Sequence, residues 1–208
     1  MQRSVNQIID LLERRQKRVF AWLADPNRIE GIGEYLHILD HAKPDTIDEE
    51  FKRTYRHYYR LRFFDKNASV RRGMDTYYFN LLRRRVETGT IDFPDTLHRL
   101  HERFGRYELS FASKLLHTVD KNLPLYDENV RKVVGWSRTH GRGADEILAR
   151  YEELNSVIHC LLLDSSVKTY IRKLRREFVQ SGIPKTNVAK ISDTKMLDFA
   201  LWALGALI

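Results

Sequence analysis

The chain has 208 residues, of which 42% are hydrophobic and 31% are charged, and its formal net charge at pH 7 is +8. These proportions are ordinary for a folded protein and exclude a disordered or low-complexity chain. The length suits a single globular unit over residues 1–208, with either one sizeable core or two small helical lobes, about 1–90 and 91–208.

Apolar residues recur at helical spacing through almost the whole chain, beginning with a first helix predicted over residues 5–23. The pair Asp25-Pro26 ends this helix, and Pro44 ends a second one whose apolar residues fall between 29 and 39.

Further helices follow in the middle of the chain. Thr46 and Glu49 have the spacing of a capping box, so we expect a third helix to begin there. A fourth is predicted over residues 74–86, and Pro94-Asp95 opens a fifth.

The second half of the chain continues this pattern, with helices predicted over residues 147–162 and 167–178. Their boundaries are a loop at Gly141 and Gly143, a stop at Gly182 and Pro184, and a cap for the last helix at Ser192. All five prolines fall between periodic segments, and no alternating strand pattern occurs. The sequence therefore predicts an all-α protein of about nine or ten helices.

The segment 110–136 reads SFASKLLHTVDKNLPLYDENVRKVVGW and carries the most specific pattern of the chain. Lys114 lies near a helix start, and an apolar run, Pro124 and Asp127 follow before a new helix begins. This order resembles the second half of the helix-hairpin-helix DNA glycosylase signature, in which a helix-borne lysine and a loop aspartate share one pocket.

The resemblance implies a helix-hairpin-helix DNA glycosylase-like bundle, with Lys114 and Asp127 at the two catalytic positions. The helix from Asp95, the turn at 104–106 and the helix from Ser110 would form the hairpin pair. The chain departs from the family in three ways: serine and alanine replace the glycines before the lysine, the step from proline to aspartate is one residue longer, and the lysine and aspartate are closer in sequence. The implied function is base excision in DNA repair, with or without lyase activity.

The chemistry of this pair can be stated without the family. An amine attacks the sugar carbon of a nucleotide only when it is unprotonated, so Lys114 would need burial or nearby positive charge. Asp127 would stabilise the cationic sugar that forms as the base leaves, and would orient the amine or a water. The alternative is structural: Asp127 caps a helix and Lys114 is solvated, although a capping residue can also be catalytic.

A basic segment, residues 51–85, contains eleven Lys or Arg against two Asp, a net charge of +9, interleaved with nine aromatic residues. Arginines that pair with phosphates beside aromatic rings are typical of nucleic-acid binding, and we expect DNA as the partner. The arginines predicted to bind nucleic acid are Arg53, Arg56, Arg60, Arg71, Arg72, Arg83, Arg84 and Arg85.

Alternative interpretations of the basic segment, which do not involve nucleic acid, stay open. Its rings, among them Phe63 and Phe64, also have core spacing, and its cations, Lys66 included, can solvate a surface or bind an acidic protein. The alternative function is therefore a non-catalytic helical scaffold that binds DNA or protein.

Signals for metals and cofactors are weak, so none is predicted. The pairs His37 with His41 and His98 with His101 have helical spacing, but no supporting carboxylate or cysteine accompanies them. No phosphate-cradling glycine loop occurs. Cys160 lies in an apolar helix and is expected to be inert core, and the three tryptophans, Trp22, Trp136 and Trp202, are expected in the core as well.

The ends of the chain bear on location. The N-terminal segment contains charges that interrupt its apolar residues, unlike a secretion signal. The most apolar segment, 196–208, is too short to span a bilayer and predicts a buried terminal helix. With a single cysteine no internal disulfide can form. We therefore expect a cytoplasmic protein without a membrane partner.

Overall fold

The computed structural model describes residues 2–62, 68–137 and 143–208. Phe63, Phe64 and Lys66 of the basic segment and Gly141 of the predicted loop lie outside these ranges. Within them the chain has eleven α-helices, one short 3-10 helix and no strand, so the predicted all-α fold is confirmed. The helices are α1 (Val5–Leu23), α2 (Pro26–His41), η1 (Pro44–Thr46), α3 (Glu49–Tyr59), α4 (Ala68–Thr88), α5 (Phe93–Phe104), α6 (Leu109–Val119), α7 (Glu128–Val134), α8 (Ala144–Leu163), α9 (Ser165–Gln180), α10 (Lys185–Lys190) and α11 (Asp193–Ala206).

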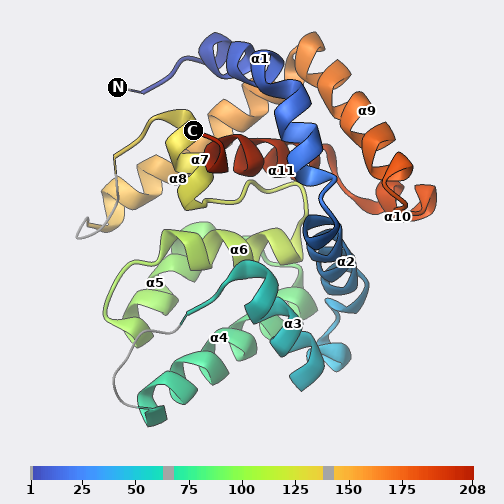
Figure 1. Ribbon diagram of the computed structural model, residues 1–208. Helices are drawn as coiled ribbons and strands as arrows, with labels where there is room; N and C mark the ends of the chain where they lie inside the picture. The colour runs from blue at the N-terminus through green and yellow to red at the C-terminus, as the bar shows by residue number, and fades with distance from the viewer. Residues whose placement is uncertain (1, 63–67, 138–142) are drawn as a thin grey trace.

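The helices form two groups that pack on each other (Figure 1). One group contains α3, α4, α5 and α6, with α2 packed on α3. In the other, α11 runs through the centre and packs against α1, α7, α8 and α9. The first helix of the chain thus belongs with the C-terminal helices, and the buried apolar residues of both groups form one continuous core.

Local chemistry explains the first two helix boundaries. Ser4 and Gln7 form a capping box at the start of α1. The carboxylate of Asp25 accepts a hydrogen bond from the Asn27 amide, and Pro26 occupies the first turn of α2, where its missing N–H has no partner to lose. The predicted boundary at this Asp-Pro pair is therefore confirmed.

The predicted capping box at Thr46 is wrong. The cap of α3 is Asp48, whose carboxylate accepts a hydrogen bond from the Phe51 amide at 2.9 Å. Thr46 instead lies in η1 and donates its hydroxyl to the His41 carbonyl. Asp48 stands directly before the first helical residue, where an acidic side chain also suits the positive end of the helix dipole.

The helical hairpin expected around residues 104–106 is present. The helix α5 ends at Phe104, Gly105 adopts the left-handed conformation with φ of 69°, and α6 follows from Leu109 and packs on α5. Glycine suits this position because it has no Cβ to clash. Residues 111–118 of α6 are all buried, so this helix is enclosed on every side.

The structure also bears on the predicted burial of Cys160 and on the predicted absence of a membrane-spanning helix. Cys160 is exposed and not in the core, because it lies two positions beyond buried Ile158, more than half a turn around α8. Throughout the described part of the chain, no helix combines the length and apolarity needed to cross a membrane.

Candidate functional site

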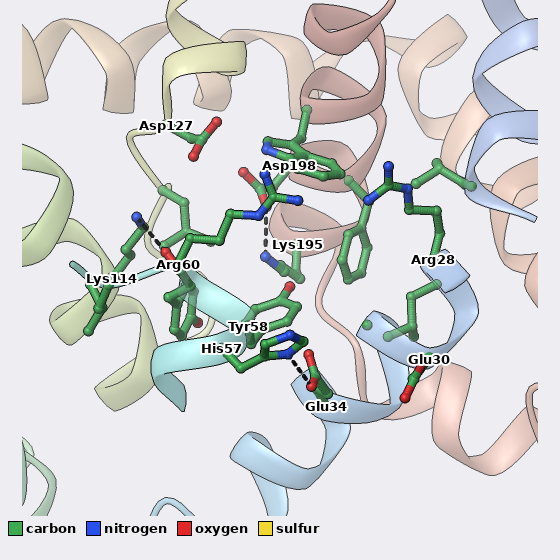
Figure 2. Close-up of a pocket in the computed structure, with 18 of the residues that line it drawn as sticks. Arg28, Glu30, Glu34, His57, Tyr58, Arg60, Lys114, Asp127, Lys195 and Asp198 are labelled. Carbon is green, nitrogen blue, oxygen red and sulfur yellow. Dashed lines mark hydrogen bonds and ion pairs between the residues drawn. The ribbon is translucent and has the colours of Figure 1, made fainter. Parts of the chain in front are cut away.

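A pocket of about 480 Å³ lies where the two groups of helices meet, and we call it the central pocket (Figure 2). Its walls come from the end of α1, from α2, from α3 and the residues after it, from α6, from the loop before α7 and from α11. Lys114 and Asp127, which are thirteen positions apart in sequence, both line it. The predicted pair therefore shares one cavity.

Lys114 reaches the central pocket from the enclosed helix α6. Its side chain is buried, and its Nζ donates a hydrogen bond to the carbonyl oxygen of Tyr59 at 3.0 Å. Burial lowers the pKa of the Lys114 ammonium, and the carboxylates of Asp127 and Asp198 oppose this shift in part. The alternative of a solvated lysine is therefore wrong.

Asp127 caps α7, as the alternative interpretation predicted. Its Oδ1 accepts a hydrogen bond from the Asn129 amide at 2.9 Å, and its side chain is half-buried at the pocket wall. Within the described residues it forms no direct ion pair with Lys114, whose ammonium is directed to Tyr59. The two groups interact electrostatically across the pocket.

A second lysine and aspartate, on α11, line the same pocket and were not predicted. Lys195 Nζ lies 2.7 Å from Asp198 Oδ2, and only 3% and 12% of the two side chains are exposed. Burial raises the pKa of the Asp198 carboxyl, while Lys195 opposes that rise. Asp198 is the only charged residue in the most apolar segment of the sequence, 196–208. A charge in such a segment indicates a buried carboxylate that has either an ion-pair partner or a function, and this was the signal in the sequence.

Aromatic rings surround the Lys195 ammonium. Its Nζ lies 4.8 Å from the ring centre of Tyr35, 5.2 Å from that of Tyr58 and 4.7 Å from that of Phe199. Cation–π attraction of this kind partly replaces lost hydration. The ion pair and the rings together make burial of this ammonium tolerable.

A buried histidine fixes one of these rings. Burial lowers the pKa of His117 to about 3, so its imidazole is neutral at pH 7. The Leu123 carbonyl, 2.7 Å from Nδ1, can only accept, so Nδ1 carries the proton. His117 Nε2 then accepts the hydrogen bond of the Tyr35 hydroxyl at 3.1 Å. This chain of hydrogen bonds orients Tyr35 beneath Lys195.

The mouth of the pocket combines cations with tryptophan rings. Trp22 and Trp202 meet edge to face with ring centres 5.0 Å apart, and both are half-buried. The guanidinium carbon of Arg28 lies 4.2 Å from the Trp22 ring, and that of Arg60 lies 5.8 Å from the Trp202 ring. Of the three tryptophans expected in the core, only Trp136 is fully buried there. The prediction is wrong for Trp22 and Trp202, which line the pocket.

The eight predicted nucleic-acid-binding arginines have different surroundings. Arg56 binds Asp75, Arg83 donates to the carbonyls of Pro44 and Ile47, and Arg85 binds Asp95. Five are exposed: Arg53, Arg60, Arg71, Arg72 and Arg84. Five rings of the basic segment are buried in the core: Phe51, Tyr55, Tyr59, Tyr78 and Phe79.

The histidine pairs are engaged with other rings. His37 and His41 stack on each other with ring centres 4.1 Å apart, and His101 stacks on Tyr107. Among the described residues, no group of three or more His, Cys, Asp or Glu is placed to hold a metal ion.

Comparisons with protein-family models, with curated proteins and with solved structures found no match to this chain. The geometry of the central pocket is therefore the basis for assigning a function.

Proposed function

We propose that this chain acts on a nucleotide extruded from nucleic acid, with DNA favoured, and cleaves its glycosidic bond with Lys114 and Asp127. The observation that carries the proposal is that a buried lysine with a lowered pKa and an aspartate line one cavity. Perturbed ionisable groups in a cleft are typical of catalytic sites.

The central pocket suits a nucleobase with its sugar. Its volume of about 480 Å³ lies within the usual range for small-molecule sites. The rings of Tyr58, Phe199 and Trp202 along its wall offer apolar faces for stacking, as base-flipping enzymes require. The carboxylates of Asp127 and Asp198 can accept hydrogen bonds from the base or the sugar.

The proposed reaction uses the neutral amine of Lys114 as the nucleophile. Its nitrogen forms a bond to C1′ of the sugar while the bond from C1′ to the base breaks, and the electron pair of that bond leaves with the base. Asp127 stabilises the positive charge on the sugar and relays one proton from the attacking nitrogen to the leaving base. Burial of Lys114 supports this role because a lowered pKa increases the neutral fraction of the amine.

Cations at the pocket and on the surface beside it support a nucleic-acid substrate. Arg28, Arg60 and Arg62 line the pocket, and Arg53 is exposed on α3. Such side chains would pair with backbone phosphates and displace condensed counterions. We therefore expect affinity for DNA to fall steeply as the salt concentration rises.

Replacement of Asp127 by asparagine tests the proposed chemistry. Asparagine caps a helix as well as aspartate does, so Asp127→Asn keeps the α7 cap but removes the charge. Release of a base from duplexes with damaged bases should fall by a factor on the order of 100, with thermal stability nearly unchanged. The matched control is Asp164→Asn at the cap of α9, which should keep full activity. Equal activity of Asp127→Asn and wild type would remove Asp127 from the mechanism.

A non-catalytic scaffold is the second candidate. It is favoured by the hydrogen bond that already engages Lys114 with Tyr59, and by the use of Asp127 Oδ1 as a helix cap. On this alternative, the protein would bind DNA in a salt-sensitive way and release no base from any substrate.

A further inference from the structure

Arg28 and Arg60 approach the same tryptophan from different elements. Arg28 belongs to the first turn of α2, and Arg60 follows the last residue of α3. Their guanidinium carbons lie 5.6 and 5.8 Å from the centre of the Trp202 ring. In Figure 2 the two guanidinium groups point into the pocket from opposite sides. Both cations therefore lie within 6 Å of the centre of one ring that lines the pocket.

The N–H donors of the Arg28 and Arg60 guanidinium groups have no hydrogen-bond acceptor within the described residues. Across the described residues, neither guanidinium has a carboxylate or carbonyl partner, whereas Arg56 binds both oxygens of Asp75. Of the two glutamates of α2 that line the pocket, Glu34 is paired with His57 at 2.6 Å, and Glu30 is exposed two positions after Arg28. Two planar cations with free donors, fixed against one ring, form a site for an anion with several oxygens.

The backbone of Arg60 gives a second, independent observation. Its φ of 50° lies in the left-handed region, and no other non-glycine residue in the described ranges has a positive φ. The equivalent caps of α5 and α7 are glycines, Gly105 and Gly135, which adopt this conformation without strain. Residues held in such sparsely populated backbone conformations cluster at active sites and ligand-binding sites.

We propose that Arg28 and Arg60 form a phosphate site at the mouth of the central pocket, and that it holds the phosphate of the nucleotide whose base enters the pocket. This inference rests on the proposed function for the identity of the base-bearing ligand. Inside the pocket the charge of Asp198 is balanced by Lys195, whereas Asp127 forms no ion pair within the described residues and repels a phosphate, which keeps the phosphate at the arginines and directs the neutral base inward. The ligand class is a nucleoside monophosphate unit, either free or within a DNA strand.

Binding of free nucleotides tests the site. The fluorescence of Trp22 and Trp202 can report titration with each of the four deoxynucleoside 5′-monophosphates, with the matching nucleosides, and with inorganic phosphate. At least one monophosphate should bind about tenfold more tightly than its nucleoside, since a charge-assisted contact contributes about that much. Arg28→Gln and Arg60→Gln should each remove this advantage, whereas Arg176→Gln on the exposed face of α9 should not.

The variant Arg60→Gly separates binding from folding. Glycine relieves the backbone strain at this position, so the midpoint of thermal unfolding should rise while the affinity for the monophosphate falls about tenfold. Arginine variants that bind both the monophosphates and a single-stranded oligonucleotide as tightly as wild type does would overturn the phosphate site.

A single-stranded oligonucleotide distinguishes a strand from a free nucleotide. If only the oligonucleotide binds in an Arg28- and Arg60-dependent way, the phosphate belongs to a strand; if monophosphates bind as well, the site also accepts free nucleotides. Arginine-dependent binding without base release would retain the site and reject the glycosylase. Base release that is unaffected in Arg28→Gln and Arg60→Gln would retain the glycosylase and reject the site.

Discussion

Lys114 Nζ donates a hydrogen bond to the carbonyl oxygen of Tyr59 at 3.0 Å, and this bond ties the enclosed helix α6 to the end of α3. Tyr59 is the last residue of α3 and directly precedes Arg60, so the buried amine and the cation at the pocket mouth are set by the same turn. The position of the proposed nucleophile is thus coupled to the rim of the pocket.

The buried amine predicts a pH dependence of stability. The pKa of Lys114 is lowered in the folded protein, so between that pKa and 10.5 the unfolded chain binds more protons. The free energy of unfolding contributed by this group therefore rises with pH in that window. Urea unfolding of wild type and Lys114→Met at pH 7 and pH 9.5 should show a larger gain for wild type. Equal gains would mean that the amine has an ordinary pKa.

The neutral imidazole of His117 predicts a loss of stability in acid. Its pKa is about 3 in the folded protein against 6.5 unfolded, so the unfolded chain binds the extra proton between these values. The free energy of unfolding should then fall by about 1.4 kcal/mol per pH unit as the pH drops through this window. His117→Gln can keep both hydrogen bonds without titrating. Urea titrations at pH 6.5 and pH 4.5 should give wild type the steeper decline, and parallel declines would contradict a buried neutral histidine.

The ion pair on α11 predicts a strong non-additive effect. Asp198→Asn leaves the Lys195 ammonium buried without a carboxylate, which should cost about 3–5 kcal/mol in the free energy of unfolding. The double variant Lys195→Met with Asp198→Leu removes both charges and should recover most of that loss. Chemical denaturation of Lys195→Met, Asp198→Leu and the double variant measures the coupling, and simple additivity would indicate that the two charges do not interact.

The close approach of α11 to α7 predicts the effect of a single methyl group. A Cβ at Gly205 would lie 2.2 Å from the backbone oxygen of Asn129, so α7 would have to move. Gly205→Ala should lower the free energy of unfolding by about 1–3 kcal/mol, and it should also displace Asp127, two residues before Asn129. The matched control is Gly33→Ala in α2, where a Cβ meets nothing within 4 Å and should stabilise the helix by about 0.5–1 kcal/mol. Similar effects of both substitutions on thermal unfolding would contradict the tight contact.

Helical periodicity was enough to predict the fold because nearly every helix buries one apolar face. Helical periodicity did not predict short helices or the exact residue at which a helix begins. The six residues of α10 are too few to display a period, and Asp48 caps α3 in place of Thr46 because the helix begins only at Glu49. The apolar stretch around Cys160 predicts a buried cysteine, but only one face of α8 is buried and Cys160 lies on the exposed one.

The candidate site was predictable in part. Lys114 and Asp127 stand out in sequence because their order resembles a known signature, and both line the central pocket. Lys195 and Asp198 were missed because an apolar terminal helix indicates a core, and only the packing of α11 places its charges at a cavity. Arg28 lies far from the basic segment in sequence, so only the fold brings it beside Trp202.

Trapping with borohydride tests the proposed amine chemistry most directly. Wild-type protein is mixed with duplex DNA that carries an abasic site, sodium borohydride reduces any imine, and peptide mass spectrometry locates the adduct. We predict a covalent adduct on Lys114 that is lost in Lys114→Met and kept in Lys121→Met, a change of an exposed lysine. An adduct on Lys195, or salt-sensitive DNA binding without any adduct or base release, would contradict the assignment of Lys114 as the nucleophile.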